Sequence, residues 1–259
     1  MNWRAWFAAA AVPAVLAGSP AAAPAADISH ITDYSIRLAG FPVATASFRS
    51  AFDGRRYTIS GRMDSAGLAE ILSSTHGTTS VSGTLADGKL RATNYSMSYR
   101  SGKRARAIDV AFRNGDVVRA SVRPERKRQP ENWVPVKASD MRSVLDPISG
   151  LIIPASTKVC PKTLPIFDGE SRMDIKLFDK GTRPFSTRGF EGEVKVCGVR
   201  FVPRAGYRKG RKDVEYLRKL ASMEIWFAKA EAVDMYAPVF VRIPTALGPV
   251  TVSATRFGG

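Results

Sequence analysis

Residues 94–115, NYSMSYRSGKRARAIDVAFRNG, decide the fold class of this chain. Apolar and polar residues alternate at positions 95–99 and again at positions 108–112, and the turn dipeptide Ser101-Gly102 lies between the two runs. Successive side chains of a strand point to opposite faces of its sheet, so this alternation predicts two half-buried antiparallel strands joined as a hairpin.

The same pattern extends outward over most of the chain. Hairpin dipeptides at Asp53-Gly54, Asp87-Gly88 and Asn114-Gly115 separate alternating runs between residues 31 and 122, which predicts a meander of hairpins. Alternation returns at residues 173–177, 194–196, 225–227 and 239–243. The predicted fold class is mainly β, with a single strongly curved antiparallel sheet, an open or spiral β-barrel, wrapped around one to three short helices.

Three segments break the alternation and predict short helices, at residues 66–73, 139–151 and 213–221. Ser139 and Asp140 are candidate N-caps for the second helix, and Pro147 kinks or ends it. Helices this short need tertiary packing, so we expect them to cover the concave face of the sheet.

Residues 1–26 have the features of a cleaved signal peptide. One positive charge precedes an apolar run, and Ala23-Pro24-Ala25-Ala26 supplies a small-residue cleavage site. An uncleaved membrane anchor is the alternative, but the apolar run is shorter than the roughly 20 residues of a spanning helix, and Pro13 interrupts it. We therefore expect residues 27–259 to form a single β-rich domain that is soluble and periplasmic.

The expected export of the chain decides how its two cysteines, Cys160 and Cys197, are interpreted. In an oxidising compartment an isolated pair favours a structural disulfide, although two buried free thiols remain the alternative. The bridge would close a loop of 37 residues, which the chain-entropy estimate makes worth about 4 kcal/mol. Only His30 and His76 could join the cysteines around a metal, so we expect no metal site and no cofactor.

The chain is strongly basic, with 39 Lys and Arg residues against 23 Asp and Glu residues. Such a charge favours polyanions, and for an exported protein these are envelope lipids, glycans or acidic proteins rather than nucleic acid. Solubility alone is the alternative explanation for the charge. The candidate anion-binding residues lie in two expected loops: Arg123, Arg126, Lys127 and Arg128, and Arg208, Lys209, Arg211 and Lys212.

Three places could carry chemistry, and each also has a structural explanation. Asp168, Glu170 and Asp174 could form an acid–base cluster, but Asp168-Gly169 is also a hairpin turn beside which Arg172 would pair with a carboxylate. Asp146, before Pro147, could be a buried carboxylate with a raised pKa, or an acceptor of local hydrogen bonds at a kink.

His76 could be the base of a serine hydrolase, with a serine and Asp64 or Asp87. The chain has no G-x-S-x-G nucleophile elbow, so a partly exposed histidine at the start of a strand is the simpler interpretation. Phosphate-loop, dinucleotide and calcium-loop motifs are also missing from the sequence.

The sequence resembles the exported bacterial proteins grouped as family 3108 of domains of unknown function. The similar positions are Ala39-Gly40-Phe41-Pro42, Asp146-Pro147, Cys160, Asp168-Gly169, Arg172, Cys197, Gly206-Tyr207 and residues 238–248. The resemblance spans most of the mature chain. It implies a periplasmic location and a fold like the curved open barrels of periplasmic lipoprotein carriers, which can hold an acyl chain, but it implies no reaction and no catalytic residue.

These observations predict a non-enzymatic envelope protein with a binding or scaffold role. In the binding role it would hold a lipid acyl chain or another anionic envelope ligand. An apolar cavity of roughly 300 Å³ or more favours the binding role, and a filled interior favours the scaffold. The alternative is a hydrolase of envelope material, which requires that at least two of Asp168, Asp174 and His76 meet in a cleft.

Overall fold

The computed structural model describes residues 28–67, 70, 74–125 and 128–258. The expected signal peptide lies outside these residues, as does most of the helix expected at residues 66–73. The strands are β1 (Ile28–Leu38), β2 (Phe41–Asp53), β3 (Arg56–Ser65), β4 (Thr75–Ala86), β5 (Lys89–Ser101), β6 (Arg104–Arg113), β7 (Asp116–Arg123), β8 (Trp133–Val134), β9 (Ile153–Pro154), β10 (Lys162–Phe167), β11 (Arg172–Thr187), β12 (Phe190–Ala205), β13 (Tyr207–Arg208), β14 (Met223–Ala230), β15 (Met235–Ile243) and β16 (Val250–Gly258). The helical elements are α2 (Lys212–Lys219) and the 3-10 turns η1 (Ala138–Met141), η2 (Ser149–Leu151) and η3 (Glu231–Val233).

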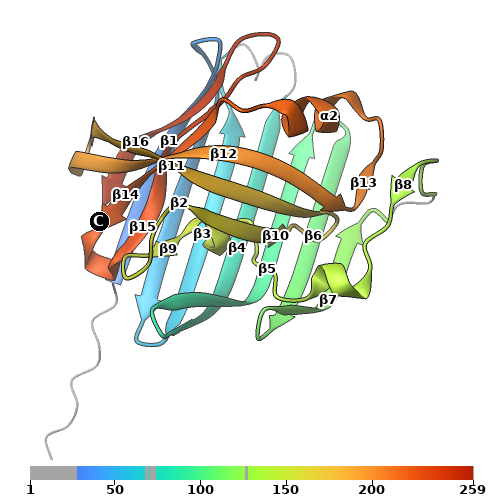
Figure 1. The fold of residues 1–259 in the computed structure, drawn as a ribbon, viewed down its shortest axis with the longest axis horizontal. Coiled ribbons are helices and arrows are strands. Elements are labelled where there is room, and N and C mark those ends of the chain that lie inside the picture. Colours follow the sequence, from blue (N-terminus) through green and yellow to red (C-terminus); the bar gives the residue numbers. More distant parts are fainter. Residues whose placement is uncertain (1–27, 68–69, 71–73, 126–127, 259) are drawn as a thin grey trace, which may run out of the picture.

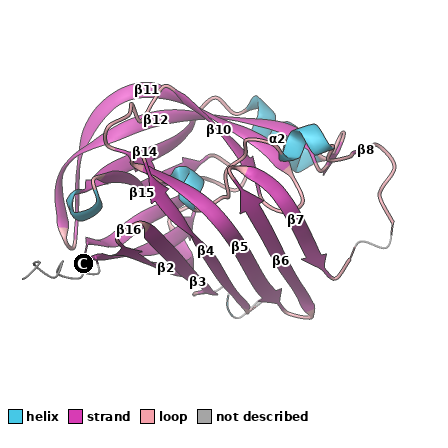
Figure 2. Cartoon of the chain, turned by 90° about the horizontal axis from the view of Figure 1, so that it is seen from below, coloured by secondary structure: helices cyan, strands magenta, loops and turns pink. Residues whose placement is uncertain are grey.

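One antiparallel sheet of 14 strands forms the body of the molecule, in the order β10-β11-β12-β14-β15-β16-β1-β2-β3-β4-β5-β6-β7, with β9 paired to β15. Strands β1–β7 follow one another in sequence and in space, so the predicted meander is confirmed. The sheet bends until β10–β12 lie across one face of β3–β6 (Figures 1 and 2). The predicted class, a single curved antiparallel sheet in an open barrel, is therefore confirmed.

The order of the described sheet ends at β7 on one side and at β10 on the other, and one short segment bridges these edges. The backbone N–H of Val144 donates to the carbonyl of Gly115, at the start of β7, over 2.8 Å. Leu145 pairs with β10, since its N–H donates to Pro165 O (2.8 Å) and its carbonyl accepts from Phe167 N (2.9 Å). The linker thus ties the first half of the sheet to the second.

The β10–β11 turn forms a second tie between the two halves. The carboxylate of Asp168 accepts the backbone N–H groups of Glu170 (2.9 Å) and Ser171 (2.7 Å), so the predicted Asp-Gly turn is confirmed. Arg106 of β6 donates its Nε to the carboxylate of Glu170 over 2.8 Å. Gly169 lies against β6, where a Cβ would come within 2.3 Å of Ile108 Cγ2.

We expect the substitution Gly169→Ala to destabilise the protein by about 1–3 kcal/mol, because it combines an unfavourable positive φ with a clash against β6. Gly181→Ala is the matched control, since Gly181 has a similar φ of +85° and nothing within 4 Å of its Cβ position. Urea unfolding of both variants separates backbone strain from the clash. Equal losses would show that the contact with Ile108 does not matter.

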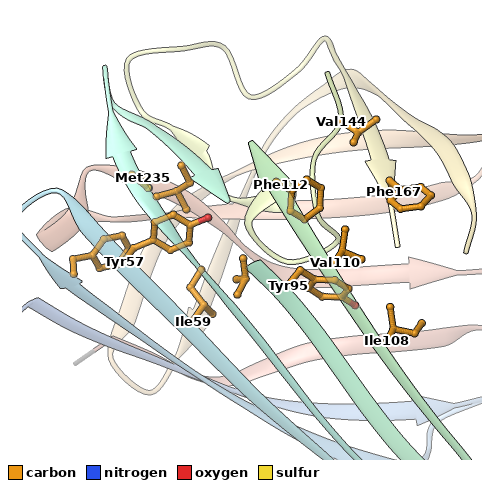
Figure 3. Packing of buried hydrophobic residues seen from close by; sticks show 12 residues of the cluster. Tyr57, Ile59, Tyr95, Ile108, Val110, Phe112, Val144, Phe167 and Met235 are labelled. Carbon is orange, nitrogen blue, oxygen red and sulfur yellow. The ribbon is translucent and has the colours of Figure 1, made fainter. Parts of the chain in front are cut away.

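The main core lies between the two layers of the bent sheet. The inward residues of β3–β6 form one wall, as predicted from their alternation, and Val144, Phe167 and Met235 cover it from the other side (Figure 3). The inward residues of this wall are Tyr57, Ile59, Val81, Tyr95, Ile108, Val110 and Phe112.

The helix predicted at residues 139–151 is wrong, because this segment forms two 3-10 turns, η1 and η2, with an irregular stretch between them. Ser143 takes a left-handed φ of +50° there, which no α-helix allows. Leu145 is used instead for pairing with β10, and η2 packs inside the sheet against β5 and β10. We call residues 143–153 the plug.

The helix predicted at residues 213–221 is confirmed as α2, at Lys212–Lys219. It packs against β12 at the upper rim in Figure 1, and none of its residues is buried. The helical turn enclosed by the sheet is therefore η2.

Candidate functional site

A groove of about 540 Å³ lies on the concave face of β3–β5, beyond the edge of the core. Two rows of paired residues form its floor, Gly61–Thr79–Met97 and Met63–Gly77–Tyr99. They continue the inward faces that carry Ile59, Val81 and Tyr95 in the core. Phe48 of β2 and Pro147 and Ile148 of the plug complete the walls. We call this cavity the inner-face groove.

Two glycines make room for the groove. A Cβ at Gly61 would come within 2.5 Å of the Phe48 ring, so this glycine lets Phe48 pack flat on the sheet. A Cβ at Gly77 would meet only ordinary contacts, at 3.5 Å or more, and the space above it is part of the cavity. Met63 and Tyr99 flank Gly77 and are 37% and 36% exposed, so apolar surface reaches the mouth of the groove.

The polar side chains of the groove already have hydrogen-bond partners in the sheet. Thr75 and Ser101 share a hydrogen bond of 2.8 Å, and the Thr79 hydroxyl donates to Ser96 O over 2.9 Å. Burial raises the pKa of Tyr95 to about 12, so this phenol stays neutral at physiological pH. A wall of this kind suits an apolar chain better than a polar substrate.

Asp146 shapes the plug that bounds the groove. It is fully buried, and its Oδ1 accepts the backbone N–H groups of Ile148 (2.9 Å) and Ser149 (2.8 Å). The Ser149 hydroxyl donates to Oδ2. Burial raises the pKa of Asp146 although these hydrogen bonds oppose the shift. Asp146 is therefore both a buried carboxylate with a raised pKa and an acceptor of local hydrogen bonds, so the two interpretations given above hold together.

A second cavity, of about 550 Å³, lies on the other side of the plug and is lined by Asp146, Ser149 and the start of β10. Lys89 and Lys162 stand at this cavity. Burial and the charge of Lys89 lower the pKa of Lys162, whose ammonium donates to Thr157 Oγ1 over 3.0 Å. Its lining is therefore more polar and more basic than that of the inner-face groove.

The sulfur atoms of Cys160 and Cys197 lie at bonding distance, with their Cα atoms 6.1 Å apart. The bridge links the start of β10 to the middle of β12, where Cys197 is fully buried. It anchors the edge strand that pairs with the plug.

Residues just after the first basic loop, rather than its basic side chains, lie beside the second basic loop. Strands β8 and β13 pair, and Lys209 N donates to Asn132 O over 3.0 Å, so residues 130–134 lie beside residues 207–211 around a hollow of about 490 Å³. Arg211 pairs with Asp213 at 2.8 Å. Arg123 lines a different hollow and pairs with Asp109 at 3.0 Å. Arg126 and Lys127 lie outside the described residues, and anion binding by these two residues and by Arg128, Arg208 and Lys212 stays a prediction.

The three carboxylates of the predicted acidic cluster each have a separate hydrogen-bond partner. Asp168 caps its own turn, and burial raises its pKa. Burial alone would raise the pKa of Asp174, but hydrogen bonds from Arg172 (2.7 Å) and Arg204 (2.7 Å) outweigh it and lower the pKa. The predicted pairing of Arg172 with a carboxylate is therefore present, and Asp174 serves an ion-pair network.

His76 lies on the outer face, in a hydrogen-bonded chain. Its Nε2 is 2.8 Å from Ser74 Oγ, and its Nδ1 is 2.7 Å from Asp64 Oδ1. Two hydrogen bonds lower the pKa of Asp64: the larger effect comes from the bond with Arg62 and the smaller from the bond with His76. The connectivity is that of a serine–histidine–aspartate triad, but the His76 side chain is 54% exposed. The part of the chain that the structure describes contains no group of three His, Cys, Asp or Glu side chains placed to hold a metal ion.

The fold and the groove define an all-β protein whose curved, open sheet carries an apolar groove on its concave face. No helix among the described residues is long and apolar enough to cross a membrane. A family model matches residues 33–255, and the chain belongs to this family, described as Protein of unknown function (DUF3108).

A solved structure, the beta-barrel-like protein of domain of unknown function DUF1849 from Brucella abortus, is similar to the chain. It shares 10% identity over 89% of this chain and 97% of that chain, with a TM-score of 0.49. No curated protein matches the chain.

Proposed function

We propose that this chain is a non-enzymatic binding protein of the bacterial envelope that holds the acyl chain of an anionic lipid in the inner-face groove. The observation that carries the proposal is the groove itself, whose volume of about 540 Å³ exceeds the threshold of roughly 300 Å³ set above. The scaffold role predicts a filled interior, so the groove favours binding.

Two further features support the proposal. The sequence of residues 1–26 has the features of an export signal, and the Cys160–Cys197 bridge suits an oxidising compartment such as the periplasm. The excess of basic residues favours an anionic head group over a neutral one.

We expect the substitution Gly77→Leu to weaken binding of a fluorescent long-chain fatty acid at least about tenfold, a loss of about 1.4 kcal/mol. The leucine side chain would occupy the groove, while its Cβ fits without a clash and its φ is unstrained. The variant should fold at least as stably as the wild type, because glycine weakens a strand interior.

The matched control is Ser60→Leu, which adds the same side chain to an exposed position of β3 on the opposite face. It should bind the probe like the wild type. Native mass spectrometry of protein purified from the periplasm, followed by lipid extraction, would then identify the natural ligand. Unchanged probe affinity in the Gly77 variant would refute the groove as the binding site.

The hydrolase alternative now rests on the Ser74–His76–Asp64 chain alone, because Asp168, Asp174 and His76 have separate partners. Turnover of an added long-chain ester, lost on Ser74→Ala, would support the hydrolase and overturn the non-enzymatic proposal.

A further inference from the structure

Exposed apolar side chains gather at one end of the molecule. Eight large apolar residues are exposed among the described residues, and the highest values of this group are those of Leu247 at 78% and Phe41 at 69%. Both stand at hairpin turns, β1–β2 and β15–β16, which lie together at the top of Figure 1. Three other exposed apolar residues, Met63, Tyr99 and Tyr216, lie at the same end of the molecule.

The two hairpin turns are in direct contact. Ala39 N donates to Pro249 O over 2.9 Å, and a Cβ at Gly248 would come within 2.7 Å of Ala39 Cβ. Phe41 and Leu247 therefore belong to one surface, although more than 200 residues separate them in the sequence. Helix α2 joins this surface, because the Tyr216 hydroxyl donates to Pro244 O over 3.3 Å.

The mouth of the inner-face groove opens at the same end. Strand β3 ends and β4 begins here, and Thr75 N donates to Ser65 Oγ over 3.0 Å. Ala66 N donates to Val43 O over 2.9 Å, which ties this edge to the β1–β2 hairpin. We call the surface formed by Phe41, Leu247 and Tyr216, with Met63 and Tyr99 at the groove mouth, the tip.

Positive charge surrounds the tip. Arg37 of β1 and Arg242 of β15 both pair with Thr251 of β16, the strand between β1 and β15 in the sheet. Each arginine stands one residue before the end of its strand. Lys103 stands in the β5–β6 turn, and Lys219 ends α2. Within the described ranges none of these four side chains forms an ion pair with a carboxylate, whereas Asp213 and Glu215 of α2 pair with Arg211 (2.8 Å) and Arg218 (3.1 Å).

We propose that the tip docks on the surface of an anionic lipid bilayer. Phe41 and Leu247 would enter the boundary between head groups and acyl chains, and the four unpaired cations would lie near the phosphates, which attract them. The two most exposed apolar side chains stand on separate turns, and the four cations lie at the same end of the molecule. A protein partner would be expected to cover one continuous apolar patch. Separate apolar side chains beside cations fit the flat surface of an anionic bilayer better. The inference goes beyond ligand binding, but it would place the groove mouth against the source of an acyl chain.

The test is co-sedimentation with vesicles of phosphatidylglycerol and phosphatidylcholine, compared with vesicles of phosphatidylcholine alone. We expect the wild type to bind the anionic vesicles, and the double variant F41S/L247S to bind at least about tenfold more weakly, because binding follows buried apolar area. Val118→Ser is the matched control, since Val118 is 55% exposed but lies in β7, near the β6–β7 turn at the opposite end. It should leave binding unchanged.

Two further variants separate this inference from the proposed function. R37Q/R242Q should weaken binding to anionic vesicles and reduce its dependence on salt. Gly77→Leu should lose the fatty-acid probe but still bind vesicles, so the two proposals can fail separately. The docking proposal is overturned if the wild type does not bind anionic vesicles, or if F41S/L247S binds them as well as Val118→Ser does.

Discussion

Replacing Asp146 with alanine should destabilise the protein by about 3 kcal/mol or more, the largest effect that we expect from a single side chain. The substitution leaves the N–H groups of Ile148 and Ser149 and the Ser149 hydroxyl without their acceptor, at a place where Asp146 and Ser149 are buried. Each buried donor without a partner costs about 1–3 kcal/mol. Chemical unfolding of both proteins gives the difference directly.

Asp146→Asn is the control for this prediction. The amide oxygen can accept the same two backbone N–H groups, and the amide has almost the shape of the carboxyl group. At a pH near or below about 3.9, where the wild type holds its proton in both states, the Asn variant should therefore stay within about 1 kcal/mol of the wild type. If alanine and asparagine cost the same, the hydrogen bonds of Asp146 do not hold the plug.

The same pair of proteins has a predictable dependence on pH. Burial raises the pKa of Asp146, so the native state holds its proton more tightly than the unfolded state does. The stability from this proton is fully present below the unfolded pKa of about 3.9 and is lost as pH rises through the native pKa. Because asparagine does not titrate, Asp146→Asn should gain stability relative to the wild type as pH rises, by at most about 1.4 kcal/mol per pH unit.

Removing the disulfide by the double substitution C160A/C197A should destabilise the protein by about 4 kcal/mol, because the bridge closes a loop of 37 residues in the unfolded chain. The loss is a large share of the roughly 5–15 kcal/mol stability of a typical domain. Among the strands, β10 should loosen most, because it is the edge strand that the bridge anchors. Urea unfolding of the wild type with and without a reductant measures the same loss without changing a side chain.

The double alanine variant is the internal control for that measurement. Its midpoint should not respond to reductant, and reduced wild type should approach it. Equal midpoints for oxidised and reduced wild type would mean that the bridge does not stabilise the fold.

The sequence predicted the strands well because their signal is local. Alternation at Tyr57, Ile59 and Gly61, or at Tyr95, Met97 and Tyr99, depends only on which face of the sheet is buried. The helix at residues 139–151 was predicted wrongly because Val144, Leu145 and Ile148 are apolar at helical spacing for another reason. They fill the space between two layers of sheet in an irregular segment that Asp146 holds in place.

The groove could be predicted only in part. A glycine inside a strand signals a close approach or a missing side chain, and Gly61 and Gly77 carry that signal. The sequence does not show that they lie in neighbouring rows of a concave face, because this depends on the register of β3 and β4. The meeting of residues 130–134 with residues 207–211 is equally hidden, since a ladder of two residues leaves no pattern.

The pairing of β16 with β1 sets the order in which the molecule can be assembled. Strands β1–β7 can form early from hairpins, since their contacts are close in sequence. Their apolar face, with Ile59, Val81 and Tyr95, stays exposed until β10–β16 arrive from the other end of the chain. The native state is thus reached only after the last strand is available, and a chain that lacks it leaves both an open edge and an uncovered wall for aggregation.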